Sequence, residues 1–335
     1  MKNQLFKNEH QVKLFHEIKK TLPDKNALPY QVSDLLGVGL DAAYRRIRGE
    51  KPISFEEAII LCQNFQISME TLTNVVIGES FIRCRYSPLN LEDINNYLNL
   101  FQAISDNIEH AKLAPDCEIL LSALTIPPFN ILSYKDLNFF IIFSWSKSVY
   151  DFADSFEVFA NKFDSLETFE KCCAKIVRNY LSVPSTDIWT NNTTDSILKL
   201  INYHYEMRHF KEKKTPLFLC EQMLDLMNTL QKWSEKGKKG KQETPFNFFI
   251  SETDIGNTYI LLKNSKRTSC MVKLYTINAL IISDERFCQE TESWLRNTAR
   301  RATLISGASE VVRFQFFDAQ FLKIRRLMEK IQSGI

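Results

Sequence analysis

Residues 28–72 are the most informative stretch of the chain, with the sequence LPYQVSDLLGVGLDAAYRRIRGEKPISFEEAIILCQNFQISMETL. We expect two short helices here with a sharp turn between them, because Gly37 can take a positive φ at little cost. Ser33 is small enough to let the second helix cross close to the first, and Val38 would fill the core beside the turn. The apolar positions of the two helices follow helical spacing: Val32, Leu35 and Leu36, then Leu40, Ala43 and Ile47.

The second helix, from about residue 40 to residue 48, would turn a polar face outward. An arginine can donate two hydrogen bonds to guanine, an aspartate can accept one from cytosine, and a tyrosine can bind a phosphate or pack on a thymine methyl group. This composition suits a recognition helix in the major groove of double-stranded DNA. The predicted DNA-binding residues are Asp41, Tyr44, Arg45, Arg46 (on the flank of the face), Arg48 and Lys51.

The segment after this helix carries the signals of a helix end and a new helix start. Gly49 is a typical C-cap, and Pro52 follows shortly after it. Ser54 and Glu57 form a capping-box pattern, in which each side chain bonds the other's backbone amide. The next helix would face inward with Ala58, Leu61, Cys62 and Phe65, and a short closing helix would run from Ile67–Ser68 to Leu72.

These signals together resemble the phage-repressor (XRE-type) helix-turn-helix domain over residues 10–76. The stretch LLGVGLDAAYRRIRGEKPISFEEA is similar to a bacterial subfamily related to BetR-type regulators. The resemblance implies sequence-specific DNA binding and transcription regulation. Pro29 stands where many XRE domains have a phosphate-binding Gln, and Arg46 and Ile47 stand where an aliphatic residue and a Glu are usual, so single base contacts do not carry over.

The remainder of the chain predicts a second, larger domain. We expect a helix-turn-helix domain at 1–78, a linker at 79–88 and a sensing or dimerisation domain at 89–335. The predicted fold class is mainly α, with a small antiparallel sheet (α+β) built from 117–126 and 246–282. Helices are expected at 5–21, 91–112, 135–181 in two or three pieces, 194–211, 216–236, 284–304 and 308–332.

Composition excludes several classes of protein. A net charge of +2 argues against a protein that coats DNA by charge alone. Met1–Lys20 is charged throughout and lacks the apolar core of a signal peptide, and Leu137–Trp145 is too short to span a bilayer. We therefore expect a cytoplasmic protein with no membrane partner. The eight cysteines lack C-x-x-C spacing, and most lie among apolar residues, which predicts buried free thiols.

No sequence motif predicts catalysis, a metal site or a cofactor. Nucleotide-binding glycine loops, the H-E-x-x-H pattern and the G-x-S-x-G pattern are all missing from the chain. His204 and His209, five residues apart, would lie on different helix faces as ordinary polar residues. We therefore expect no enzyme activity. The alternative is a protein-interaction scaffold with a helical N-terminal module that does not bind DNA, and a small-molecule or protein effector of the second domain stays open.

A homodimer is expected, because one helix-turn-helix domain contacts only a short half-site. The last predicted helix offers a candidate interface, since its apolar residues repeat at intervals of three and four. The alternative is that this stripe packs on the core of its own domain. The stripe consists of Phe314, Phe317, Phe321, Ile324, Met328 and Ile331.

Overall fold

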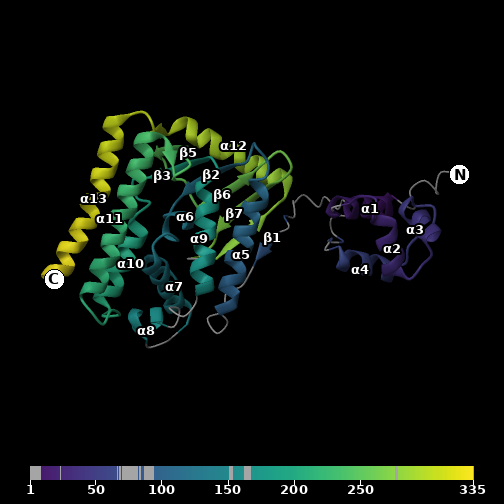
Figure 1. The fold of residues 1–335 in the computed structure, drawn as a ribbon, viewed down its shortest axis with the longest axis horizontal. Helices are drawn as coiled ribbons and strands as arrows, with labels where there is room; N and C mark the ends of the chain where they lie inside the picture. The colour runs from purple at the N-terminus through teal and green to yellow at the C-terminus, as the bar shows by residue number, and fades with distance from the viewer. Residues whose placement is uncertain are drawn as a thin grey trace. The chain divides into compact units, whose positions relative to one another are not determined.

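The chain divides into two compact units, Met1–Phe81 and Ile82–Ile335 (Figure 1). Each has a core of its own. The computed structural model describes residues 9–22, 24–65, 67, 69, 82, 84–86, 94–150, 154–161, 167–275 and 278–334.

The first unit is a small bundle of short helices. The predicted N-terminal helix is present from Glu9, and the two helices of the quoted stretch lie where their apolar spacing placed them. Leu14, Phe15 and Ile18 of the first helix pack on Val32, Ala43 and Leu61 of the others. Its described helices are α1 (Glu9–Thr21), α2 (Leu28–Leu36), α3 (Leu40–Ile47) and α4 (Phe55–Asn64).

The turn between α2 and α3 is set by Gly37, as predicted. Gly37 has a φ of 61°, and its amide donates to the Asp34 carbonyl while the Val38 amide donates to the Ser33 carbonyl. This pair of bonds is a Schellman motif, which satisfies the last carbonyls of a helix. The Ser33 hydroxyl also donates to the Val38 carbonyl at 2.6 Å. Ser33 thus fastens the turn, a role that its small size alone did not indicate.

The capping box at the start of α4 is confirmed. The Ser54 hydroxyl accepts the Glu57 amide at 3.1 Å, and the Glu57 carboxylate accepts the Ser54 amide at 2.9 Å. Ala58, Leu61 and Cys62 are buried, as their spacing predicted. Most of the predicted closing helix that ends at Leu72 lies outside the described residues, as does most of the predicted linker.

The second unit is built on a nine-stranded sheet in its described part. The strand order is β1-β8-β7-β6-β2-β3-β5-β4, and β9 pairs with β5 beside this path. The strands are β1 (Cys84–Tyr86), β2 (Glu118–Ala123), β3 (Ser185–Thr190), β4 (Lys238–Lys239), β5 (Thr244–Ser251), β6 (Tyr259–Lys263), β7 (Thr268–Lys273), β8 (Ala279–Ile282) and β9 (Thr303–Leu304).

This sheet corrects the predicted fold class. A mainly α domain with a small antiparallel sheet is wrong, because the sheet is large and mixed and the unit is α/β. Strands β2, β3 and β5 run parallel to one another, and the other pairings are antiparallel. The predicted segments, 117–126 and 246–282, contain β2, most of β5 and all of β6 to β8, but β1, β3, β4 and β9 lie outside them, and β3 lies between β2 and β5. Without β3, only the antiparallel pairings could be expected.

Helices cover both faces of the sheet. Ile119 and Leu121 of β2 face the large core, whereas Leu120 faces the other side and packs with Cys288 and Leu295 of α12. The large core includes residues of α5 to α11 and α13. The described helices are α5 (Ile94–Ala111), α6 (Pro128–Ile131), α7 (Lys135–Val149), α8 (Phe156–Asn161), α9 (Glu167–Leu181), α10 (Asp195–Glu206), α11 (Lys214–Lys236), α12 (Glu285–Arg301) and α13 (Glu310–Ser333).

The apolar stripe of α13 belongs to this core. Phe317, Ile324 and Ile331 are buried, and Phe321 and Met328 pack against the same cluster. Phe314 at the start of the helix is 64% exposed. The stripe is therefore not a dimer seam, and α13 lies along α11 and α10 of its own unit (Figure 1).

Candidate nucleic-acid interface

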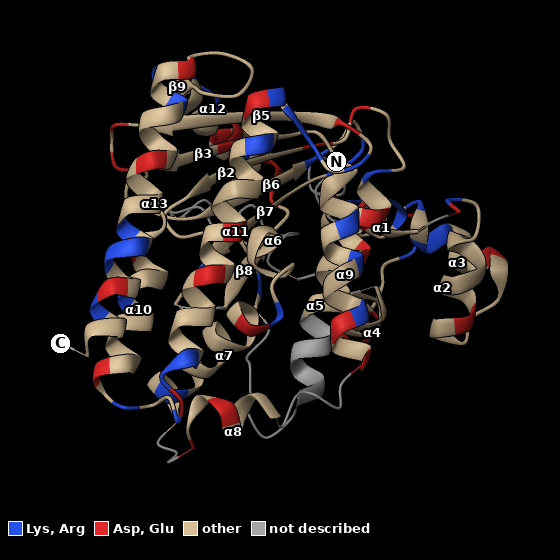
Figure 2. Ribbon diagram, turned by 60° about the vertical axis from the view of Figure 1, so that its left-hand side comes forward, with Lys and Arg blue, Asp and Glu red and all other residues tan. Residues whose placement is uncertain are grey.

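The outer face of α3 carries most of the predicted DNA-binding side chains. Asp41, Tyr44, Arg45 and Arg48 are exposed, as is Lys51 in the loop that follows. Arg45 and Arg48 each leave 53% of their side chains open. Figure 2 shows the basic positions of α3, whereas the neighbouring α2 has no Lys or Arg. This face is available to a partner.

Arg46 is an exception and corrects the prediction for the flank of the helix. It is only 7% exposed. Its guanidinium Nη2 donates to Glu57 Oε1 at 2.8 Å, its Nε donates to Glu57 Oε2 at 3.3 Å, and its Nη1 reaches the Ala42 carbonyl at 3.4 Å. A side chain so enclosed is not offered to DNA. Arg46 holds α3 against α4 instead.

Glu57 is the junction between these two helices. Burial alone would raise the pKa of its carboxyl, but the Arg46 guanidinium and the Ser54 amide hold that pKa below its usual value. One carboxylate thus closes the capping box of α4 and also neutralises the buried arginine of α3. The orientation of α3 therefore depends on a charge in α4.

Leu40 departs from the predicted inward face. It is 37% exposed at the start of α3, whereas Ala43 is buried and Ile47 is partly buried. Leu40, Tyr44 and Arg48 are spaced by four residues, so they form one exposed row along the helix. Apolar, aromatic and cationic groups are thereby presented together.

Gln11 of α1 is a positioning residue that the sequence analysis missed. Its amide Nε2 donates to the carbonyls of Arg46 and Lys51, at 2.7 and 2.8 Å, and its Oε1 accepts the Ile53 amide at 3.0 Å. These bonds fasten the end of α3 and the loop behind it. The partners are 35 to 42 residues away in sequence, so no local pattern could indicate them.

The loop after α3 begins with a second Schellman motif. Gly49 has a φ of 75°, and its amide donates to the Arg46 carbonyl while the Glu50 amide donates to the Arg45 carbonyl. The predicted helix end at Gly49 is confirmed. The motif sets Glu50 and Lys51 directly beside the exposed end of α3.

Glu50 is the acidic member of this face. Its carboxylate accepts hydrogen bonds from Arg48 Nε at 2.6 Å and Nη2 at 3.0 Å, and Arg45 lies 4.0 Å away. The hydrogen bond from Arg48 lowers the pKa of Glu50 and raises that of Arg48. A phosphate or a guanine must therefore compete with Glu50 for the Arg48 guanidinium.

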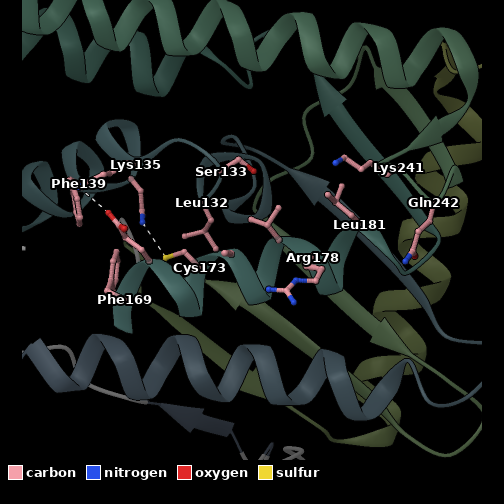
Figure 3. A pocket seen from close by; sticks show the side chains of 14 residues that line it. Leu132, Ser133, Lys135, Phe139, Phe169, Cys173, Arg178, Leu181, Lys241 and Gln242 are labelled. Carbon is pink, nitrogen blue, oxygen red and sulfur yellow. Dashed lines mark hydrogen bonds and ion pairs between the residues drawn. The ribbon is translucent and has the colours of Figure 1, made fainter. Parts of the chain in front are cut away.

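The second unit contains an open cavity of about 740 Å³ beside α7 and α9 (Figure 3). Lys135 pairs with Glu170 at 2.9 Å at one end, and Arg178 and Lys241 line the other. Cys173 also lines it, but burial raises the pKa of this thiol to about 12, so it is not a thiolate nucleophile. These groups do not assemble into a catalytic arrangement.

His204 and His209 meet, contrary to the prediction of separate faces. Helix α10 ends at Glu206, so the chain folds back and the two Nδ1 atoms lie 2.8 Å apart. His204 Nε2 also bonds the buried Ser144 hydroxyl at 3.0 Å. Burial lowers the pKa of His204 to about 4, helped by the neighbouring His209 and Lys147. His204 is buried and His209 is half-buried, and burial also lowers the pKa of His209, so the two form a neutral hydrogen-bonded pair.

Comparison with protein-family models, with curated proteins and with solved structures found no match. The described helices include none with the length and apolar character needed to cross a membrane. Within the same residues, no three His, Cys, Asp or Glu side chains are grouped so that they could hold a metal ion. Seven of the eight cysteines are buried free thiols, as predicted, and Cys84 is exposed.

Proposed function

We propose that the chain is a sequence-specific DNA-binding transcription regulator that inserts α3 into the major groove of double-stranded DNA. The observation that carries the proposal is the exposed face of α3, with Tyr44, Arg45 and Arg48, on a helix whose other side is fixed by Ala43 and Arg46. A recognition helix must be held rigidly by the rest of its domain, since its side chains must contact base edges in a fixed register.

The side chains of this exposed face and of the following loop can bind base edges and phosphates. Arg45 lies in the middle of the exposed face and is the proposed reader of guanine through its O6 and N7 atoms. Arg48 and Lys51, at the end of the helix and in the loop, are the proposed phosphate contacts. Tyr44 and Leu40 offer apolar surface for thymine methyl groups, and Asp41 offers an acceptor for cytosine.

A symmetric dimer is part of this proposal. One α3 helix covers only a few base pairs, and pairing two copies doubles the site. Because the apolar stripe of α13 packs in the core of its own unit, the dimer would have to use another surface. Sedimentation equilibrium of the full chain tests this part, and a monomer at about micromolar concentration would contradict it.

The test of the proposal is selection from a random duplex library by the full chain, followed by fluorescence anisotropy on the selected duplex at several salt concentrations. Binding should weaken as salt rises, with a log–log slope of about 0.9 per phosphate contact. Arg45→Ala should cost about 1–3 kcal/mol on the selected site. Arg286→Ala removes an exposed guanidinium from α12 and is the matched control.

The alternative of an interaction scaffold predicts a different result. In that case no duplex would be enriched, and Arg45→Ala would bind DNA as weakly as the wild-type chain. Enrichment of one motif, together with loss of binding in Arg45→Ala but not in Arg286→Ala, would decide for DNA recognition.

A further inference from the structure

A second, more enclosed cavity lies in the second unit, between the sheet and helices α5, α6 and α7. Its volume is about 110 Å³. The sheet side is formed by neighbouring residues of β6, β7 and β8, among them Ile260 and Met271, which are register partners. The helix side is apolar apart from Asn138 and includes Ile104, Ile131 and Ile142. Ligand sites are typically apolar hollows of this kind with a few placed polar groups.

Lys273 brings a positive charge to this apolar lining. It is register partner to Ala279, which also lines the cavity, and its ammonium donates to Thr125 Oγ1 at 2.6 Å. No carboxylate of the described residues forms an ion pair with it, and burial lowers the pKa of its ammonium to about 8. Lys273 is half-buried. A partly desolvated cation without a counter-ion is unfavourable, and an anion placed beside it would offset that cost.

Asn278 has a buried side-chain oxygen without a hydrogen-bond partner in the described part of the chain, which is a second and independent indication of a ligand. The residue is 3% exposed and lines the same cavity, and its Oδ1 has no hydrogen-bond partner among the described residues. Its Nδ2 donates to the Tyr86 hydroxyl at 3.4 Å. Buried acceptors are nearly always satisfied, so this oxygen is available to a hydroxyl or N–H group of a molecule in the cavity.

We propose that this cavity binds a small apolar carboxylate that also carries a hydroxyl or amide group. The carboxylate would pair with Lys273, the hydroxyl or amide would donate to Asn278, and the hydrocarbon would lie against the isoleucines. Sugars and nucleotides are disfavoured, because the walls would leave their polar groups unpaired. A phosphate dianion is also disfavoured, because the single ammonium of Lys273 would neutralise only one of its two charges. The inference goes beyond DNA recognition, and its test uses no DNA.

The position of the cavity fits a ligand site in an α/β unit. Ile126 and Pro128 line it directly after β2, at the carboxyl end of a parallel strand. Crevices outside the carboxyl ends of such strands are the usual ligand sites of open α/β sheets. At the same edge, β6 runs antiparallel to β2, so its first residues, with Thr258 just before them, lie beside the end of β2.

The experiment is isothermal titration of the full chain with 3-hydroxybutyrate, which is small enough for a cavity of about 110 Å³, with butylammonium as the probe of opposite charge. We expect a Kd of about 100 µM to 10 mM for the carboxylate and no binding of butylammonium. Lys273→Met should weaken carboxylate binding about tenfold to a hundredfold, since it removes one charge-assisted hydrogen bond. Lys266→Met, an exposed lysine in the turn between β6 and β7, is the control and should bind like the wild type.

Folding of the variants is checked by thermal unfolding followed by tryptophan fluorescence. Lys273→Met should fold, because a thioether replaces a desolvated ammonium among apolar neighbours. Ala279→Phe provides a second test, since its ring would fill the cavity and abolish binding in a folded protein. No binding by the wild-type chain, equal binding of butylammonium, or unchanged affinity in folded Lys273→Met would each overturn the proposal.

Discussion

Replacing Arg46 by Met should destabilise the first unit without removing a DNA contact. The substitution keeps an apolar stem but deletes the guanidinium that meets both oxygens of Glu57 and the Ala42 carbonyl. Glu57 would keep the Ser54 amide but lose its buried counter-charge. Breaking a buried ion pair from one side costs about 3–5 kcal/mol. Because 20% of the Glu57 side chain is exposed, we expect a somewhat smaller cost, about 2–4 kcal/mol.

This loss is large beside the stability of a small helical unit, which is of the order of 5 kcal/mol. Hydrogen exchange with mass spectrometry on the full chain measures it locally. Peptides from α2, α3 and α4 should exchange about thirtyfold to a thousandfold faster in Arg46→Met, since each 1.4 kcal/mol is a factor of ten. All four tryptophans, Trp145, Trp189, Trp233 and Trp294, lie in the second unit. Tryptophan fluorescence should therefore report an unchanged unfolding transition there.

Arg48→Met is the matched control. It breaks an ion pair two residues further along the chain, but both partners are about half exposed. Exposed ion pairs contribute little to stability because water screens them, so exchange in α2 to α4 should change little. Equal exchange in Arg46→Met and Arg48→Met would refute the assignment of Arg46 as a buried structural arginine.

Three further predictions follow from the same geometry. Glu50→Gln should strengthen binding to any duplex by about twofold to tenfold at low salt, because it frees Arg48 and removes a charge that repels phosphate. Fluorescence anisotropy measures this affinity, and weaker binding by Glu50→Gln would contradict the prediction. Gln11→Leu should cost about 1–3 kcal/mol of first-unit stability, since it removes the side-chain partner of the Ile53 amide and of the Lys51 carbonyl and one of the two donors to the Arg46 carbonyl. Exchange of peptides covering residues 46–53 should rise, and unchanged exchange would remove Gln11 from its positioning role. Acidification should destabilise the second unit. The pKa of His204 is about 4 in the folded chain and 6.5 for an ordinary histidine, so the unfolded chain binds the proton first and stability falls as pH drops below about 6.5. Urea unfolding followed by tryptophan fluorescence at pH 7 and pH 5 should show this loss of stability in the wild type, and a smaller loss in His204→Gln.

The first unit was largely predictable, because its signals are local. The glycine turn at Gly37, the capping box of Ser54 and Glu57, and the apolar spacing of α4 all act within a few residues. The inward turn of Arg46 was not predictable from helical phase, because its counter-charge, Glu57, lies eleven residues away in another helix. Helical spacing also placed Leu40 inward, whereas the start of a short helix leaves it exposed.

The second unit was predicted element by element but not as a fold. Its long helices and the segments of β2, β5, β6 and β7 were expected, yet β3 was missed because its sequence, STDIWT, buries Ser185 and Asp187 beside Ile188. Asp187 is fully buried and accepts the Tyr180 hydroxyl at 3.2 Å. A buried carboxylate in a central strand breaks the apolar run by which such strands are recognised. Parallel pairing of β2, β3 and β5 joins segments that are far apart in the chain, so local patterns could not show it.

The most direct test of DNA recognition by α3 is a base-by-base specificity profile. The profile is taken from library selection with the full chain and repeated with Arg45→Ala and Arg46→Met. If α3 reads bases with its outward face, Arg45→Ala will lose preference at one base-pair position of each half-site and keep it elsewhere. Arg46→Met, measured at a temperature where the first unit is folded, will keep the whole profile. A profile unchanged in Arg45→Ala, or lost at a single position in folded Arg46→Met, would contradict the account.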